Sequence, residues 1–128
     1  MNQIQTFAAP VGRVLIALMF VTSGFSKISG YAGTQGYMEA MGVPGALLPL
    51  VIAVELLGGL AVMLGWHTRI AAFLLAGFSL LSALLFHANF GDQMQMIMFM
   101  KNASIAGGFL MIVALGGGAY SLENRLSK

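Results

Sequence analysis

Residues 45–66 read GALLPLVIAVELLGGLAVMLGW and contain one charged side chain, Glu55. An α-helix needs about 20 mostly apolar residues to cross the hydrocarbon core of a membrane. This segment is therefore predicted to be a transmembrane helix. Pro49 fits a helix start near Gly45, because proline is tolerated in the first turn of a helix.

Three more apolar segments of similar length flank this one, at about 10–28, 68–88 and 95–115. The link between the second and third segments is very short, so these two helices are expected to be antiparallel neighbours. We therefore predict an all-α membrane protein, a compact bundle of four transmembrane helices that forms a single domain over residues 1–128.

The composition supports a membrane location. Charged residues make up 8% of the chain and hydrophobic residues 59%, with a mean hydropathy of +0.89. An average soluble domain has about 25% charged residues. The net charge of +2 is too small to suggest nucleic-acid binding. The chain contains no cysteine, which excludes thiol–disulfide chemistry and thiolate metal sites.

The basic residues near the ends of the spans predict the orientation, because short cytoplasmic loops are rich in Lys and Arg. If both termini are cytoplasmic, that side carries Arg13, Arg69, Arg125 and Lys128, whereas the outer side carries Lys27. We therefore expect cytoplasmic termini, with Arg13 extending its side chain to the cytoplasmic surface.

Residues 34–41 form the longest connection between predicted spans. On a helix, Tyr37, Met38 and Met41 would share one face, which is typical of a short helix at the membrane surface. An ordinary loop is the alternative, and the sequence does not separate the two.

Polar side chains interrupt the second and fourth spans. Glu55 lies near the middle of its span, and Lys101 and Asn102 lie in the first half of theirs. A charge near the bilayer centre costs about 2.5–3.5 kcal/mol, so such residues are expected to face the bundle interior and to have partners. Counted from the outer ends at about 1.5 Å per residue, Glu55 and Lys101 have overlapping depths, so a pair between them is geometrically allowed.

Other polar residues end the first and third spans on the same outer side. These are His87, and Lys27 with Ser23 one helical turn before it. One interpretation is a polar binding cluster open toward the outer leaflet. The other is a structural ion pair that determines how the helices dock, and both remain open.

Methionine recurs in residues 94–100, MQMIMFM. Thioethers can bind Cu(I), but flexible apolar filling at the start of a helix is the better interpretation, since each helix face would hold only a pair of them. No metal site is predicted. The sequence also lacks a phosphate-binding glycine loop, HExxH, GxSxG, a close pair of carboxylates, and a haem or flavin signature.

In their order and spacing, several short motifs resemble the DoxX family of small bacterial membrane proteins. The matching pieces are Arg13, FVTSGFSK (20–27), MGVP (41–44), ELLGG (55–59), GWHTR (65–69), His87, FMKN (99–102) and Gly107-Gly108. The resemblance implies a four-helix protein of the bacterial inner membrane. It also implies an association with oxidoreductases, including thiosulfate–quinone oxidoreductase subunits.

The first functional hypothesis is an accessory subunit of a membrane redox system that binds a lipophilic molecule such as a quinone. Glu55, Lys101 and Asn102 would bind its polar head, and His87 and Lys27 would exchange protons with the outer aqueous phase. The expected partners are membrane lipid, a redox protein and a second copy of the chain. The alternatives are a non-enzymatic scaffold and a transporter of small molecules or protons; catalytic residues are not predicted.

Overall fold

The computed structural model describes residues 3–86, 91–118 and 121. Within these residues it is helical, without a strand, which confirms the predicted fold class. The elements in chain order are α1 (Gln3–Ser29), α2 (Tyr31–Ala40), η1 (Gly45–Leu47), α3 (Leu48–Ala53), η2 (Val54–Gly58), α4 (Gly59–Leu64), α5 (Thr68–Phe86) and α6 (Gln93–Leu115).

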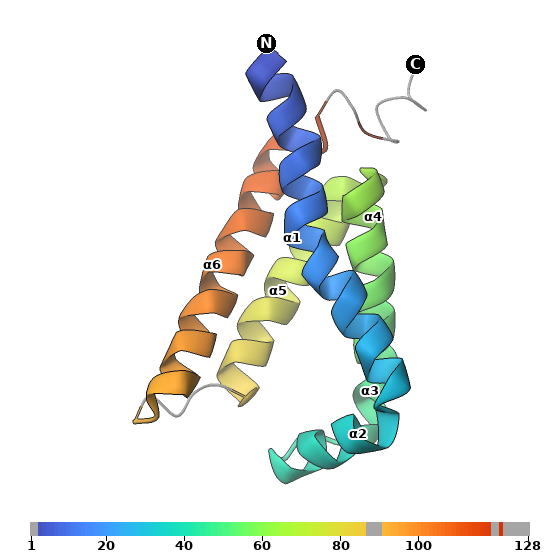
Figure 1. Cartoon of the computed structure of the whole chain (residues 1–128), viewed down its shortest axis with the longest axis vertical. Helices are drawn as coiled ribbons and strands as arrows, with labels where there is room; N and C mark the ends of the chain where they lie inside the picture. The colour runs from blue at the N-terminus through green and yellow to red at the C-terminus, as the bar shows by residue number, and fades with distance from the viewer. Residues whose placement is uncertain (1–2, 87–90, 119–120, 122–128) are drawn as a thin grey trace.

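Four helical stretches are long and apolar enough to cross a membrane: Thr6–Ser29, Gly45–Leu64, Thr68–Phe86 and Gln93–Leu115. These stretches overlap the four predicted spans, and the first begins at Thr6, before the predicted start near residue 10. The start of α1 and the end of α6 lie at one end of the bundle, as an even number of crossings requires (Figure 1). The cytoplasmic assignment of that end remains a prediction.

The second span is built from several helical types in succession. A short 3-10 turn, η1, leads into α3, where Pro49 occupies the first turn. The middle of the span, η2, is a π-helix that contains Glu55, and α4 completes the crossing. A π-helical turn inside an α-helix places one extra residue in the turn and is frequent at functional sites. Here it coincides with the charged residue of the span.

The helices α5 and α6 form the most extensive pair, while α1 packs across the second span (Figure 1). The core between them contains Phe20 of α1 and Phe109 of α6, whose rings meet edge to face with centroids 5.4 Å apart. On α5, Ala72 and Ala76 belong to this core, and Ser79 and Ala83 are buried further along the helix. Small side chains allow the close approach on which helix association in lipid depends.

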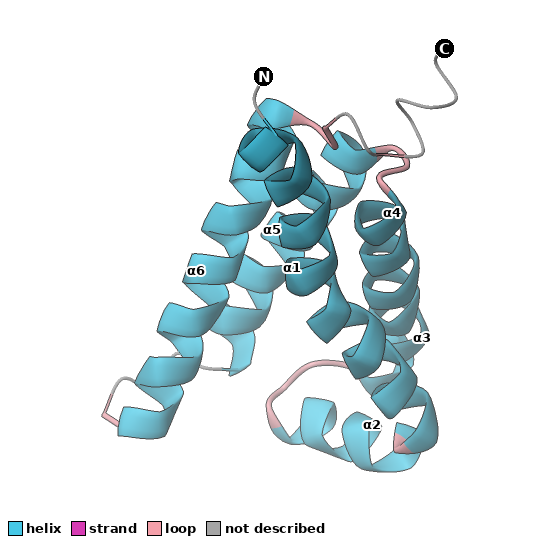
Figure 2. Ribbon diagram, turned by 45° about the horizontal axis from the view of Figure 1, so that its top comes forward, coloured by secondary structure: helices cyan, strands magenta, loops and turns pink. Residues whose placement is uncertain are grey.

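Residues 31–40 form the helix α2, so the helical alternative for this connection is confirmed. It lies at the foot of the bundle, next to the end of α1 and the start of the second span (Figure 2). Met38 of α2 is buried, and Gln35 Nε2 donates a hydrogen bond of 3.2 Å to the carbonyl of Gly45. The ring of Tyr37 stacks on Phe86 of α5 with centroids 5.5 Å apart. These contacts dock α2 against the spans.

Arg13 does not extend to the membrane surface, so that prediction was wrong. Its side chain is 3% exposed, and Nη1 donates hydrogen bonds of 3.0 Å to the carbonyls of both Val62 and Met63. The last carbonyls of a helix have no partner within the helix and carry partial negative charge. The guanidinium satisfies them at the end of α4, beside Gly65, which turns the chain with φ of +75°.

Candidate functional site

A cavity of about 550 Å³ lies between the helices in the half of the bundle nearest α2. Its lining comes from α1, α2, η1, α3, η2, α5 and α6, together with Val43 of the α2–η1 connection, and is mostly apolar. Polar side chains also face it: Ser23, Lys27, Thr34, Tyr37, Glu55, Ser79, Ser82, Lys101 and Asn102. A concave, mainly apolar pocket with a few convergent polar groups is the usual form of a small-molecule site.

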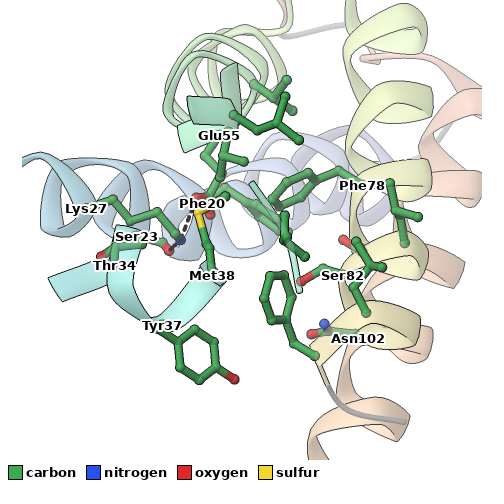
Figure 3. Close-up of a pocket in the computed structure, with 18 of the residues that line it drawn as sticks. Phe20, Ser23, Lys27, Thr34, Tyr37, Met38, Glu55, Phe78, Ser82 and Asn102 are labelled. Atoms are coloured by element: carbon green, nitrogen blue, oxygen red, sulfur yellow. Dashed lines mark hydrogen bonds and ion pairs between the residues drawn. The ribbon is translucent and has the colours of Figure 1, made fainter. Parts of the chain in front are cut away.

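An ion pair forms the polar part of one side of the cavity. Lys27 Nζ lies 2.6 Å from Glu55 Oε1 and donates a hydrogen bond of 2.7 Å to Ser23 Oγ. The Glu55 side chain is 4% exposed, and that of Lys27 is 25% exposed. Because α1 supplies Ser23 and Lys27 and η2 supplies Glu55, we call these three residues the α1/η2 wall (Figure 3).

The pairing of Glu55 with Lys101 that their depths allowed is not what the structure contains, because the partner of Glu55 is Lys27. The reason lies in the packing of η2 against α1 and in the reach of lysine. Ser23 and Lys27 are four residues apart and share a helix face, so the lysine side chain follows α1 back toward the bundle centre. Depth along the spans could not show which helix would pack against η2.

The remaining predicted residues of the fourth span line the same cavity from the other side. Lys101 is exposed and Asn102 is half-buried, and both belong to the lining. In Figure 3 Asn102 and Ser82 lie across the cavity from Lys27 and Glu55. We call Ser79 and Ser82 of α5, with Lys101 and Asn102 of α6, the α5/α6 wall. A binding role for Lys101 and Asn102 remains a prediction.

Sequence reasoning missed Ser79 and Ser82 as lining residues. Ser79 is 2% exposed, and its Oγ has no hydrogen-bond partner within the described part of the chain. The available signal was the spacing of these two serines. Three residues apart on a helix, they share a face in a segment that is otherwise almost entirely apolar.

The remaining candidates from the sequence are His87 and the methionines of residues 94–100. His87 lies outside the described residues. Met98 lines the cavity, whereas Met94, Met96 and Met100 are at least half exposed and do not converge with it. Within residues 3–86, 91–118 and 121, no three His, Cys, Asp or Glu side chains are placed to hold a metal ion.

The stack of Tyr37 on Phe86 connects α2 to the end of α5 at the edge of the cavity, and both rings belong to its lining. The site therefore combines a buried ion pair, neutral hydrogen-bonding groups and aromatic surface in one apolar chamber. Such a chamber suits a ligand with an apolar body and polar oxygen atoms. It offers hydrogen-bond donors and one acidic acceptor, but no recognised arrangement of a nucleophile and a base.

Comparison with known proteins agrees with the resemblance found in the motifs. The chain is similar to the inner membrane protein YqjF of Escherichia coli, with 52% identity over all of this chain and 98% of YqjF. It is 38% identical to the inner membrane protein YphA of the same organism, over 90% of this chain and 87% of YphA. A shorter match, 36% identity over 50% of this chain and 48% of the relative, is to the Bacillus subtilis protein named "Putative oxidoreductase CatD".

No solved structure matches the chain at a meaningful level of similarity. The two Escherichia coli relatives and the four membrane-crossing helices confirm the predicted location in the inner membrane. The sequence profile of DoxX matches residues 8–88, which is more than half of the chain. This protein therefore belongs to the DoxX family.

Proposed function

We propose that this protein binds a small lipophilic molecule with a polar head, such as a quinone, as an accessory subunit of a membrane redox system. The observation that carries the proposal is the cavity of about 550 Å³, in which the pair of the half-buried Lys27 and the buried Glu55 faces an apolar chamber. A charged pair inside a membrane protein usually marks a pathway or a binding site. The name of the Bacillus subtilis relative supports the redox setting.

The chemistry of the α1/η2 wall fits such a head group. An ammonium group donates hydrogen bonds to a carbonyl oxygen, and a carboxylate accepts one from the hydroxyl of a reduced quinol. Lys27 and Glu55 place both groups side by side at the cavity surface. A quinone and its quinol would therefore each find a complementary partner at this wall.

A scaffold function is the second candidate, and the same ion pair favours it. Lys27 and Glu55 connect α1 to the second span, and buried pairs can specify how helices dock without any chemistry. Under this alternative the cavity would hold lipid and would show no preference for quinones.

Calorimetric titration of menadione (2-methyl-1,4-naphthoquinone) into the protein in lipid nanodiscs tests the proposal, with empty nanodiscs as the blank for partitioning. We expect saturable binding by the wild type. In Lys27→Met and Glu55→Gln the affinity should fall by about tenfold or more, which corresponds to ~1.4 kcal/mol.

Glu39→Gln is the matched control, because Glu39 is an exposed carboxylate of α2 outside the cavity lining. It should bind menadione as the wild type does. Menadione uptake equal to that of empty nanodiscs would overturn the proposal and leave the scaffold alternative.

A further inference from the structure

We propose, resting on the proposed function, that the ligand enters the cavity sideways from the bilayer, through an opening between the second span and α5. The lining residues that are themselves exposed mark where the cavity reaches the surface, since inner lining residues such as Phe20 and Glu55 are buried. Among the described residues, these exposed ones are Tyr37, Leu47, Leu50, Leu81, Leu85 and Lys101. The leucines come from the second span and from α5, two from each, and we call these four residues the leucine mouth.

The leucine mouth lies where α5 and the second span separate. Near the middle of the two spans the helices touch closely, because a Cβ atom at Gly58 would lie 3.2 Å from Leu75 Cγ of α5. Toward α2 the two helices lie further apart (Figure 1). On each helix the two leucines are three or four residues apart, so they share one helix face. The mouth is therefore bordered by a column of leucine side chains on either side.

The opening lies at the depth of the hydrocarbon core. Leu50 and Leu81 each lie five residues inside their membrane-crossing segments, Gly45–Leu64 and Thr68–Phe86. At about 1.5 Å per residue, this places both about 8 Å from the ends of these segments. A lipophilic molecule dissolved in the bilayer therefore reaches the mouth without crossing water.

The side of the cavity beside α2 is closed by apolar packing. Met38 of α2 and Val43 line the cavity there but are buried, and they pack with the fully buried Leu48. The ring of Tyr37, although exposed, stacks on Phe86 of α5 and covers the same edge. A packed apolar cluster excludes water, so the aqueous phase beside α2 has no open path into the cavity.

The remaining exposed lining residue, Lys101, lies on the α5/α6 wall and marks another edge of the cavity. A lysine at membrane depth keeps its ammonium group in contact with water or lipid headgroups. The leucine side chains have no polar atoms, so an apolar molecule that enters between them displaces only lipid chains. The leucine mouth is therefore the route that costs least for such a molecule.

Thiol labelling of Ser82→Cys in nanodiscs tests this route without a quinone, because Ser82 lines the cavity and the chain has no native cysteine. Two reagents are compared: the uncharged N-cyclohexylmaleimide, which dissolves in the bilayer, and a stilbene disulfonate maleimide, which stays in water. Nanodiscs expose both membrane surfaces to each reagent. We expect the uncharged maleimide to label Ser82→Cys, and the disulfonate to label only Glu39→Cys, the exposed control on α2.

Blocking the mouth identifies the route. Leu50→Trp and Leu81→Trp, each combined with Ser82→Cys, should slow labelling by the uncharged maleimide about tenfold, which corresponds to ~1.4 kcal/mol in the barrier to entry. Leu84→Trp is the matched control and should leave the rate unchanged, because Leu84 is an exposed leucine of α5 outside the cavity lining. The two blocking variants lie on different helices, so either one carries the test if circular dichroism shows that the other fails to fold.

Rapid labelling of Ser82→Cys by the disulfonate would overturn the proposed route, since the cavity would then be open to water. A thiol that reacts with neither maleimide would also overturn it, as would a labelling rate that neither blocking variant slows. None of these outcomes depends on menadione, so the calorimetric titration judges the proposed function separately.

Discussion

Gly59 shows how a single residue determines the approach of two helices. A Cβ atom at this position would lie 3.0 Å from Val21 Cγ2 and 3.3 Å from the backbone nitrogen of Val21, which belongs to α1. The second atom is part of a helix backbone and cannot rotate away as a side chain can. Gly77, in the middle of α5, has no atom within 4 Å of such a Cβ and faces outward.

Replacing each glycine by alanine should therefore have opposite results. Gly59→Ala should lower the free energy of unfolding by about 1–3 kcal/mol, the usual cost of an overpacked core. Gly77→Ala should leave it unchanged or raise it slightly, since alanine favours the helix more than glycine does. Unfolding in mixed micelles with increasing dodecyl sulfate measures both. Equal stabilities of the two variants would contradict the close crossing of α1 and the second span.

At the level of elements, the second span packs against α1 through α4, the π-helix η2 and α3. Of these, η2 carries Glu55, whose partner Lys27 comes from the last turns of α1. On the α5/α6 side, Lys101 is exposed and does not pair with this carboxylate. The ion pair therefore connects the two elements that also form the α1/η2 wall, and it should contribute to stability whether or not a ligand binds.

A mutant cycle on this pair separates its structural contribution from its role in binding. Lys27→Met and Glu55→Gln should each destabilise the protein by about 3 kcal/mol, the lower end for a buried pair, because the Lys27 side chain is 25% exposed. The double variant should recover much of this loss, because neither charge is then left unpaired. The melting temperature in detergent, followed by circular dichroism, is the measurement.

Lys101→Met is the control for this cycle, since an exposed lysine without Glu55 as its partner should tolerate the change. A loss of stability as large as that of Lys27→Met would show that Glu55 pairs with Lys101 in the membrane instead.

For the whole molecule, the position of the cavity relative to the membrane depends on the orientation of the bundle. The residues that line the cavity include several of α2. Figures 1 and 2 show α2 opposite the end of the bundle at which α1 begins and α6 ends. If the termini are cytoplasmic, as the basic residues predict, the cavity lies toward the outer leaflet and α2 lies at the outer surface.

Cysteine labelling tests this orientation, and the absence of native cysteine provides a clean background. Glu39→Cys, at an exposed position of α2, should react with a membrane-impermeant maleimide in intact spheroplasts. Gln3→Cys, exposed at the start of α1, should react only after the membrane is permeabilised. The reverse pattern would place the cavity toward the cytoplasm.

Residue composition and spacing alone determined the number and approximate positions of the spans, whereas for the connection at 34–41 they left a helix and a loop both open. The spans follow from local properties, because bilayer thickness sets the length of an apolar segment and helical periodicity sets its faces. The same reasoning identified Glu55, Lys101 and Asn102 as polar residues that needed an explanation. It could not show which side chain would pair with Glu55.

Only the tertiary structure decided the partners. Glu55 pairs with Lys27, Arg13 caps the carbonyls of Val62 and Met63, and Ser79 faces a cavity. The two contacts join different helices, and the cavity lies between helices. All three therefore depend on how the helices are rotated relative to one another, which close packing such as that at Gly59 determines. Lysine and arginine side chains also extend several ångströms from their backbone, so the sequence position of a charge does not show where that charge lies.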